Sequence, residues 1–305
     1  MQNSGLGNIV NPLLSLIDED VYNVPELFII GYRGEPGVHD EPQHVKQGKV
    51  TCSLLDAMKV PYEVLSDNEA DLPAQFEKAY KYIKENNAQY ALVIRKGTFD
   101  DYTLQNNIPV SGKMSREQAI EKIMLSADEK TAFVSTTGMI SRELYELRDK
   151  YNMGHDRDFL TVGGMGHASQ IALGIALQKT DRQIWCVDGD GASIMQMGGM
   201  ATIGSRKPGN YTHFVLNNGA HDSVGGQPTV GRDIDLCAIA AGCGYENVIK
   251  VSTLEELDAV LKEKDTKEKL TFIEVLVTKG ARKDLGRPKS TPQENKIALM
   301  EFLKK

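Results

Sequence analysis

The chain has 305 residues, of which 41% are apolar and 25% are charged, a composition typical of a globular protein with about two domains. Its formal net charge of −7 argues against general binding to nucleic acid or to anionic membranes, although a local basic pocket could still take a small anion. The sequence shows no apolar run of transmembrane length and no signal peptide, and its four cysteines form no CxxC pair. We therefore expect a cytoplasmic protein with reduced thiols.

Short apolar runs alternate with longer amphipathic segments, which predicts parallel sheets with helices on both faces. In chain order, strands are expected at 27–31, 91–95, 131–135, 159–162, 183–187, 213–217 and 271–277. Helices are expected at 72–85, 141–150, 167–178, 194–206, 254–264 and 292–303. The pattern predicts the α/β fold class.

A stretch without periodicity separates two α/β units. We predict a linker at 101–113, between a first unit at 1–100 and a second at 114–305. The first unit is short, and it opens on a polar, glycine-containing segment typical of a loop that follows a strand. We therefore expect it to be the C-terminal part of a domain that lacks its N-terminal residues. The alternative is a naturally short domain that begins with a loop.

The clearest functional signal is a pair of polar motifs that follow two predicted strands. One strand runs into a Gly-Asp-Gly motif around Asp190, and the next runs into an Asn-Asn motif that ends at Asn218. Because one strand–helix–strand crossover separates them, both motifs should lie at the same edge of a parallel sheet, where open α/β folds bind ligands. A carboxylate, an amide oxygen and a backbone carbonyl suit Mg²⁺, and the amides of Gly191 and Ala192 can bind phosphate oxygens. The pair predicts a metal-bridged diphosphate site, although either motif alone is a common turn.

These motifs resemble the fingerprint of thiamine-diphosphate enzymes. Other segments resemble the members of that family that decarboxylate phosphonopyruvate, namely 31–37, 40–48, 187–193, 216–221 and 282–288. The resemblance covers nearly the whole chain. It implies two thiamine-diphosphate-binding-type units, each a mostly parallel sheet with helices on both faces. The first, at 1–100, would be the C-terminal part of a pyrimidine-binding domain, and the second, at 114–305, a domain that binds diphosphate and Mg²⁺.

The implied activity is the decarboxylation of phosphonopyruvate to phosphonoacetaldehyde and carbon dioxide, with thiamine diphosphate and Mg²⁺ as cofactors. Sulfopyruvate or another 2-oxo acid is the alternative substrate. The resemblance also implies a homo-oligomer with active sites between subunits, and neither nucleic acid nor membrane as a partner. The family uses a glutamate upstream of the segment that begins at Gln2, and this chain has no residues there. We therefore expect the chain, made alone, to be nearly inactive.

The resemblance assigns roles to individual residues in the second unit. The metal ligands would be Asp190, Asn218 and the carbonyl of Ala220. The cofactor contacts would come from Thr136, Thr137, Gly163, Gly164, Met165, Gly189, Gly191, Ala192 and Asn218. The carbonyl of Gly163 would accept a hydrogen bond from the amino group of the cofactor, and Met165 would support the bent shape of the cofactor. The alternative for Met165 is an ordinary core methionine.

Two histidines and a basic segment are the candidates for contact with the substrate. His44 in the first unit and His221 after the Asn-Asn motif are the candidate catalytic residues, with exposed loop histidines as the alternative. The candidate substrate contacts are Asn3, Ser4, Arg282, Lys283 and Arg287. The three cations of this set follow a predicted strand and could hold a phosphonate or a sulfonate. A solvated basic loop is the alternative for them.

A dinucleotide site is the rival interpretation of the glycine-rich turn. Gly164, Gly166 and Ser169 resemble a degenerate dinucleotide fingerprint, with Asp188 about 20 residues further on. That interpretation would make the protein an NAD-dependent oxidoreductase. Ser169 stands where the pattern needs Gly or Ala, and the Gly-Asp-Gly and Asn-Asn motifs are left without a role. The thiamine-diphosphate interpretation accounts for more of the sequence.

Overall fold

The computed structural model describes residues 1–103, 105 and 113–305. The chain divides into two compact units, which we call unit 1 (Met1–Thr103) and unit 2 (Leu104–Lys305). Most of the predicted linker at 101–113 lies outside the described residues. In the part of the chain that the structure describes, no helix is both long enough and apolar enough to cross a membrane.

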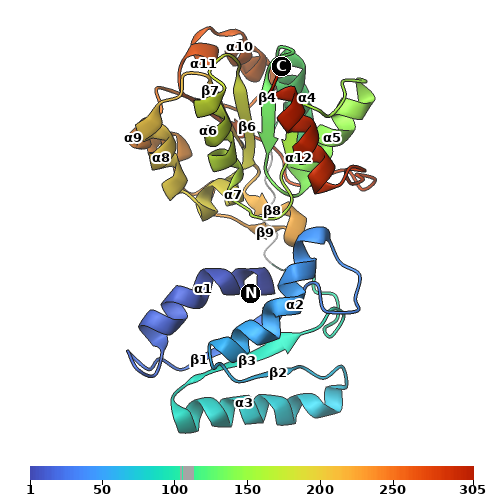
Figure 1. Ribbon diagram of the computed structural model, residues 1–305, viewed down its shortest axis with the longest axis vertical. Helices are drawn as coiled ribbons and strands as arrows, with labels where there is room; N and C mark the ends of the chain where they lie inside the picture. The colour runs from blue at the N-terminus through green and yellow to red at the C-terminus, as the bar shows by residue number, and fades with distance from the viewer. Residues whose placement is uncertain (104, 106–112) are drawn as a thin grey trace. The chain divides into compact units, whose positions relative to one another are not determined.

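Unit 1 is built on a parallel sheet of three strands in the order β1-β3-β2. Its strands and helices are α1 (Leu6–Pro12), β1 (Glu26–Gly31), α2 (Pro42–Ala57), β2 (Tyr62–Val64), α3 (Leu72–Asn86) and β3 (Gln89–Ile94). Helices α1 and α2 lie on one face of the sheet and α3 on the other (Figure 1). Because side chains alternate along a strand, Ala91 and Val93 of β3 pack on the α1–α2 side, while Tyr90 and Leu92 pack against α3.

Unit 2 contains a larger parallel sheet of six strands in the order β10-β11-β7-β6-β4-β5. The strands are β4 (Ala132–Ser135), β5 (Asp158–Leu160), β6 (Ile184–Gly189), β7 (Tyr211–Asn217), β10 (Asn247–Val251) and β11 (Thr271–Leu276). A small antiparallel pair, β8 (Ala220–His221) and β9 (Gln227–Pro228), follows β7. The sheets of both units are parallel, so the predicted fold class is confirmed.

Helices cover both faces of the unit 2 sheet. They are α4 (Arg116–Ser126), α5 (Met139–Lys150), α6 (Ala168–Gln178), α7 (Asp190–Met195), α8 (Gly198–Arg206), α9 (Leu236–Cys243), α10 (Leu254–Lys262), α11 (Asp265–Glu268) and α12 (Pro292–Phe302). One core packs the sheet against α4, α5 and α10, and the other packs it against α6, α8, α9 and α12. In β4, Phe133 faces the first core and Val134 the second, which is the alternation expected of a buried parallel strand.

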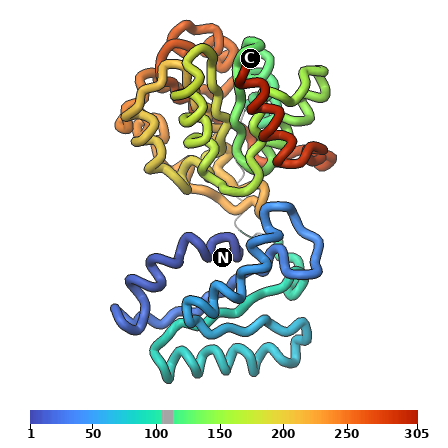
Figure 2. Tube along the Cα trace, in the orientation of Figure 1, coloured from blue at the N-terminus to red at the C-terminus, as the bar shows by residue number. Residues whose placement is uncertain are grey.

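Polar contacts buried in unit 2 fix the edge strand β5. Arg148 of α5 donates to both carboxylate oxygens of Asp158, at 2.9 and 2.7 Å, and both side chains are fully buried. Asn295 of the C-terminal helix α12 donates to the carbonyl of Asp158 and accepts from the amide of Leu160. Helix α12, red in Figure 2, therefore lies against β5.

Every predicted strand is present, with ends within two residues of the expected positions. The predicted helix at 194–206 is divided, because α7 begins at Asp190 and α8 only at Gly198. The sequence analysis missed the short strands β2 and β10, the β8–β9 pair and the helices α1, α2, α4, α9 and α11.

Candidate active site

The C-terminal ends of β5, β4, β6 and β7 lie next to one another at one edge of the unit 2 sheet. The chain order reverses between β4 and β6, which is the position where open parallel sheets bind ligands. The loops that leave these strands are also in contact. The amide of Thr136 donates to the carbonyl of Val187 at 2.9 Å, and the amide of Gly163 donates to the Thr137 hydroxyl at 3.2 Å. The predicted clustering of the strand-end motifs is therefore present in the structure.

Asp190 begins α7 directly after β6 and is 2% exposed. Burial raises the pKa of its carboxyl, while hydrogen bonds from the Thr229 hydroxyl and the Gly191 amide act in the opposite direction. Gly231 packs so closely on this side chain that a Cβ there would lie 2.5 Å from Asp190 Oδ2. The carboxylate is thus shielded from water. A cation bound beside it would offset the free-energy cost of burying its charge.

Asn218, at the end of β7, is 4% exposed and has its amide held at both ends. Its Nδ2 donates to Asp222 at 2.7 Å, and its Oδ1 accepts from the amide of Ala220 at 3.1 Å. The neighbouring Asn217 instead donates into the core, to the carbonyl of Gly231 at 2.6 Å. Asn217 Oδ1 accepts from the amide of Gly219 at 3.1 Å, so both asparagines brace the turn that carries the third candidate ligand, Ala220, but only Asn218 bonds to Ala220 itself.

The candidate metal ligands fit Mg²⁺ in chemical type. Asp190 offers a carboxylate oxygen, Asn218 an amide oxygen and Ala220 a backbone oxygen, and hard oxygen donors of this kind are the ones Mg²⁺ takes from proteins. The ends of β6 and β7 that carry them are neighbours in the sheet, since Gly189 pairs with Leu216.

His221 lies against the backbone that follows Asp190. A Cβ on Gly191 would lie 2.5 Å from His221 Cε1 and 2.7 Å from its Nδ1. The imidazole therefore belongs to the same cluster as the candidate metal ligands, and it is only partly buried. The alternative interpretation of His221 as an exposed loop histidine therefore does not fit the structure.

The glycine-rich turn after β5 has the backbone that its sequence requires. Gly163, Gly164 and Gly166 all have positive φ, at 75°, 53° and 86°, a conformation that L side chains rarely adopt. A Cβ on Gly166 would also lie 2.9 Å from the carbonyl of Ala192 in α7. Met165, between these glycines, is partly buried and is absent from the core clusters of the described residues.

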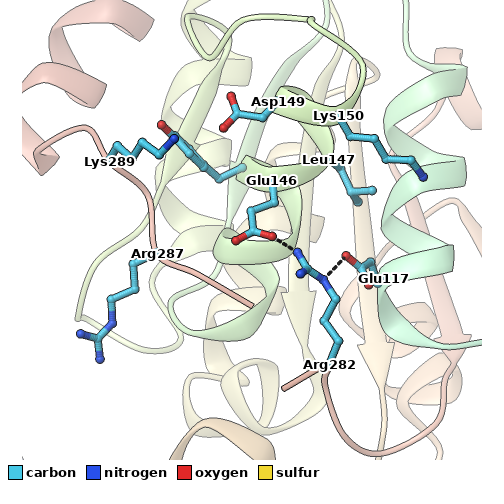
Figure 3. A pocket seen from close by; sticks show the side chains of 9 residues that line it. Glu117, Glu146, Leu147, Asp149, Lys150, Arg282, Arg287 and Lys289 are labelled. Atoms are coloured by element: carbon cyan, nitrogen blue, oxygen red, sulfur yellow. Dashed lines mark hydrogen bonds and ion pairs between the residues drawn. The ribbon is translucent and has the colours of Figure 1, made fainter. Parts of the chain in front are cut away.

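Arg282 is not the open cation that the sequence analysis expected. Its guanidinium pairs with Glu117 of α4 at 3.0 Å and with Glu146 of α5 (Figure 3). It also pairs with Asp284 at 3.1 Å. Three carboxylates therefore surround this arginine, so it ties the segment after β11 to two helices instead of presenting a charge to a substrate. Lys283 and Arg287 are exposed, and the Arg287 side chain points away from the cluster in Figure 3. A surface cavity of about 450 Å³ is lined in part by Arg282 and Arg287.

In unit 1, the structure gives Asn3 a role different from the expected substrate contact. Asn3 is 1% exposed, and its Nδ2 donates to the carbonyl of Arg33 and to the Thr51 hydroxyl, both at 2.8 Å. Its Oδ1 accepts from the amide of Arg33 at 3.2 Å. These bonds use both ends of the amide to hold the turn at Arg33. The hydroxyl of Ser4 donates to the side chain of Gln2, and Ser4 is partly buried.

His44 lies in α2, not in an exposed loop. It is 9% exposed, and its Nδ1 is buried without a hydrogen-bond partner among the described residues. Burial lowers the pKa of this imidazole, and the nearby positive charge of Arg33 lowers it further. A neutral histidine with an unsatisfied ring nitrogen is a group that could exchange a proton.

Asp188, which the dinucleotide interpretation would use to bind a ribose, is fully buried. Its carboxylate accepts from the amide of Gly189 at 3.0 Å and from the Ser193 hydroxyl at 3.3 Å, and it lies 3.4 Å from His213 Nε2. A carboxylate enclosed in this way cannot reach a ribose hydroxyl, so the residue on which that interpretation depended is structural.

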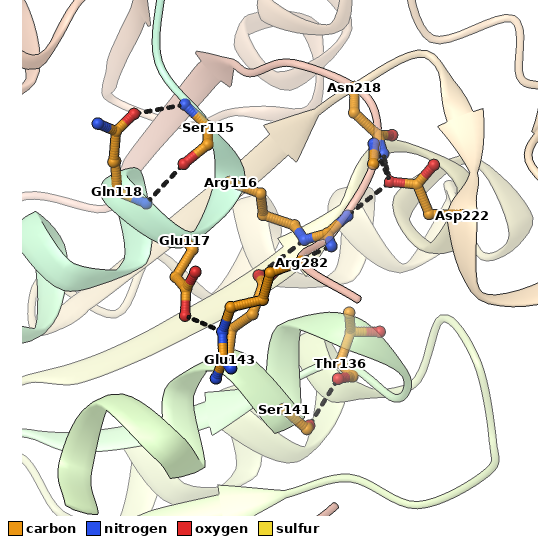
Figure 4. A network of polar contacts seen from close by, with 11 residues as sticks. Ser115, Arg116, Glu117, Gln118, Thr136, Ser141, Glu143, Asn218, Asp222 and Arg282 are labelled. Atoms are coloured by element: carbon orange, nitrogen blue, oxygen red, sulfur yellow. Dashed lines mark hydrogen bonds and ion pairs between the residues drawn. The ribbon is translucent and has the colours of Figure 1, made fainter. Parts of the chain in front are cut away.

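Sequence reasoning missed the polar network behind Asn218, which consists of Arg116, Glu143 and Asp222 (Figure 4). Asp222 lies only four residues after Asn218 in the same loop, and this short separation could have predicted that the two side chains are in contact. Nothing local connects Arg116 to this loop, because 106 positions separate it from Asp222.

The family model described as the C-terminal thiamine pyrophosphate-binding domain of thiamine pyrophosphate enzymes matches residues 136–275. Thiamine pyrophosphate is another name for thiamine diphosphate. The matched range lies in unit 2 and contains the strand-end loops described above. Unit 2 therefore contains a segment that is similar to this thiamine-diphosphate-binding domain.

Curated relatives extend the similarity to nearly the whole chain. The phosphonopyruvate decarboxylase of Streptomyces viridochromogenes is 37% identical over 308 residues, which cover 96% of this chain and 76% of the relative. The phosphonopyruvate decarboxylase of Streptomyces hygroscopicus is 36% identical over 316 residues, with 99% and 77% covered. The sulfopyruvate decarboxylase subunit beta of Methanocaldococcus jannaschii is 38% identical over 159 residues, which cover 52% of this chain and 81% of that subunit. The chain belongs to the phosphonopyruvate decarboxylase family of thiamine-diphosphate enzymes.

Proposed function

We propose that the chain catalyses the decarboxylation of phosphonopyruvate to phosphonoacetaldehyde and carbon dioxide, with thiamine diphosphate and Mg²⁺ as cofactors. The observation that carries the proposal is the buried carboxylate of Asp190 beside the turn of Asn218 and Ala220, inside the segment that matches a thiamine-diphosphate-binding domain. Similarity to two phosphonopyruvate decarboxylases over nearly the whole chain supports the substrate. Sulfopyruvate is the second candidate, because a sulfopyruvate decarboxylase subunit also matches unit 2.

In this proposal, Mg²⁺ is held by the Asp190 carboxylate, Asn218 Oδ1 and the Ala220 carbonyl. Gly189, Gly191 and Ala192 bind the diphosphate group through their backbone, and the absence of a Cβ at Gly191 leaves room for the ring of His221. The other cofactor contacts are Thr136, Thr137, Gly163, Gly164 and Met165. When bound, the cofactor supplies a ring that accepts the electrons released as a 2-oxo acid loses carbon dioxide.

We assign proton transfer to the two histidines. His221 is adjacent to the candidate cofactor loops, and its imidazole places ring nitrogens there that can accept or donate a proton. His44 has an unsatisfied buried nitrogen, and the environment favours its neutral form, which suits a proton acceptor. Because His44 belongs to unit 1, its role requires the subunit arrangement proposed below.

The anionic tail of the substrate needs a cation, and Lys283 and Arg287 are our candidates, since both are exposed on the segment after β11. Arg282 serves as the fixed point of this segment through its pairs with Glu117 and Glu146. Ser4 remains a candidate contact, while Asn3 acts indirectly by holding the turn at Arg33.

We further propose a homo-oligomer in which unit 1 of one subunit completes the site on unit 2 of another. The size of the particle in solution tests this arrangement. Sedimentation should give a mass at least twice the 33.6 kDa of the chain, and a monomer that still binds the cofactor tightly would contradict the proposal.

The activity is tested by carbon dioxide release from phosphonopyruvate, sulfopyruvate and pyruvate in the presence of thiamine diphosphate and Mg²⁺. Asp190→Ala is the matched negative control. We expect phosphonopyruvate to be the preferred substrate, and Asp190→Ala to lose most of the turnover. Preference for another 2-oxo acid, or parent-like turnover by Asp190→Ala, would contradict the proposal.

A further inference from the structure

Asp222 accepts three hydrogen bonds on one carboxylate oxygen. Its Oδ2 receives Nη1 of Arg116 at 2.8 Å, Nδ2 of Asn218 at 2.7 Å and the amide of Gly280 at 2.9 Å. The side chain of Asp222 is 9% exposed. The donors come from the start of α4, the end of β7 and the segment after β11, so Asp222 joins three parts of unit 2 (Figure 4).

A buried ion pair holds Arg116 from its other side. Nε and Nη2 of Arg116 donate to the two carboxylate oxygens of Glu143 in α5, at 2.8 and 2.9 Å. The two side chains are 4% and 2% exposed. A bidentate pair between planar groups allows one relative orientation, so Glu143 fixes the direction of the remaining guanidinium donor, which points at Asp222.

The Asp222 carboxylate determines the orientation of the Asn218 side-chain amide. An ionised carboxylate has no hydrogen to donate, so only the NH₂ end of the amide can face Asp222. The oxygen end then faces the other way, toward the turn at Ala220, where Oδ1 lies 3.1 Å from the backbone amide. A cation binds the oxygen of an amide and not its NH₂ group, so a reversed amide would remove one metal ligand.

We propose that Asp222 is a positioning residue of the metal site, which sets the amide of Asn218 with its oxygen available to the cation, and that the Arg116–Glu143 pair holds Asp222 in place. This inference rests on the proposed function, since it takes Asn218 as a metal ligand. It assigns a role to three residues outside the proposed set of metal ligands and cofactor contacts. Such supporting contacts behind metal ligands typically change metal affinity by about 10- to 100-fold.

The test titrates Mg²⁺ calorimetrically into the oligomeric protein that carries saturating thiamine diphosphate, and records the melting temperature without ligands in parallel. Asp222→Asn keeps the shape but no longer forces the orientation of Asn218, so the Mg²⁺ dissociation constant should rise by about 10-fold or more. Asp258→Asn is the matched control, because it also removes a paired carboxylate, which lies on α10 and binds Lys122 at 3.0 Å. The control should leave Mg²⁺ affinity unchanged.

A swapped double variant separates positioning from general support of the fold. In Asn218→Asp combined with Asp222→Asn, the amide at position 222 donates to a carboxylate at position 218, which offers oxygen whichever way it turns. We expect Mg²⁺ affinity to return toward the parent value. Should Asp222→Asn fail to fold, Arg116→Lys carries the same test, because it keeps the charge but loses the bidentate pair, and it should also weaken Mg²⁺ binding.

Unchanged Mg²⁺ affinity in folded Asp222→Asn would overturn the inference, and so would a swapped variant that binds no better than Asp222→Asn. Those outcomes leave the proposed function intact. A parent protein that binds no Mg²⁺ in the presence of thiamine diphosphate would instead contradict the proposed function, and this inference would fall with it.

Discussion

The contact between Gly231 and Asp190 makes a quantitative prediction for Gly231→Ala. A Cβ at position 231 would lie 2.5 Å from Asp190 Oδ2 and 2.8 Å from Asp190 Cβ, and Asp190 is too deeply buried to move aside freely. The backbone at Gly231 is not in the left-handed region, so alanine adds no backbone strain there. The variant therefore tests the steric overlap with Asp190 alone. Overpacking of this kind typically costs about 1–3 kcal/mol, which for a unit of this size lowers the melting temperature by about 2–12 °C.

The assay is thermal unfolding without ligands, with two companion variants. Gly242→Ala in α9 is the control, because no atom lies within 4 Å of its added methyl group, and alanine is favoured over glycine in a helix. It should melt at the parent temperature or slightly above. In an Asp190→Ala background, the penalty of Gly231→Ala should be smaller but not absent, because the overlap with the carboxylate is removed while the Cβ at position 190, 2.8 Å away, remains. Parent-like melting of Gly231→Ala, or a full penalty in the Asp190→Ala background, would refute the reasoning.

Three further variants test charges that the fold buries. Burial raises the pKa of Asp190 above its ordinary value of 3.8, so the ligand-free protein loses stability as pH rises from 3.8 through the raised pKa. Asp190→Asn should therefore raise the melting temperature at pH values above that pKa and abolish the stabilisation by Mg²⁺. An unchanged Mg²⁺ response would count against the metal site. The pKa of His44 is lowered by burial and by Arg33, so the stability it contributes is present above its ordinary pKa of 6.5 and is lost as pH falls. His44→Gln should therefore flatten the dependence of the urea midpoint on pH between about 7 and 5, and a slope equal to that of the parent would show that this imidazole is not the cause. Asp158→Asn breaks a fully buried ion pair with Arg148 and should cost about 3–5 kcal/mol in urea unfolding; a loss near zero would mean that the pair is not buried in solution.

The strand-end motifs could be predicted from the sequence because their geometry follows from local rules. A crossover between parallel strands brings the residues after each strand to one edge, and this rule was enough to associate Asp190 with Asn218. The glycine turn at 163–166 was assigned through the family resemblance, and the structure shows why glycine is needed there, since Gly163, Gly164 and Gly166 all have positive φ.

Helix α2 could not be predicted because its sequence looks unlike a helix. Gly48 lies in its interior, where glycine is unfavourable, and the structure shows why it is needed: a Cβ there would lie 1.6 Å from the carbonyl of Gly34. This tertiary contact is invisible in the local pattern, and without the helix an exposed loop had to be kept as the alternative for His44. The partners of Arg116 and Arg282 were missed for the same reason, since Asp222 and Glu117 are 106 and 165 positions away.

The most direct test of the account is calorimetric titration of thiamine diphosphate into the protein with Mg²⁺, with EDTA, and into Asp190→Ala with Mg²⁺. We predict binding with Mg²⁺ and its loss both in EDTA and in the variant, while NAD gives no heat in any of the three. Binding that survives both EDTA and Asp190→Ala, or no binding under any of these conditions, would contradict the claim that this sheet edge holds the cofactor through a metal.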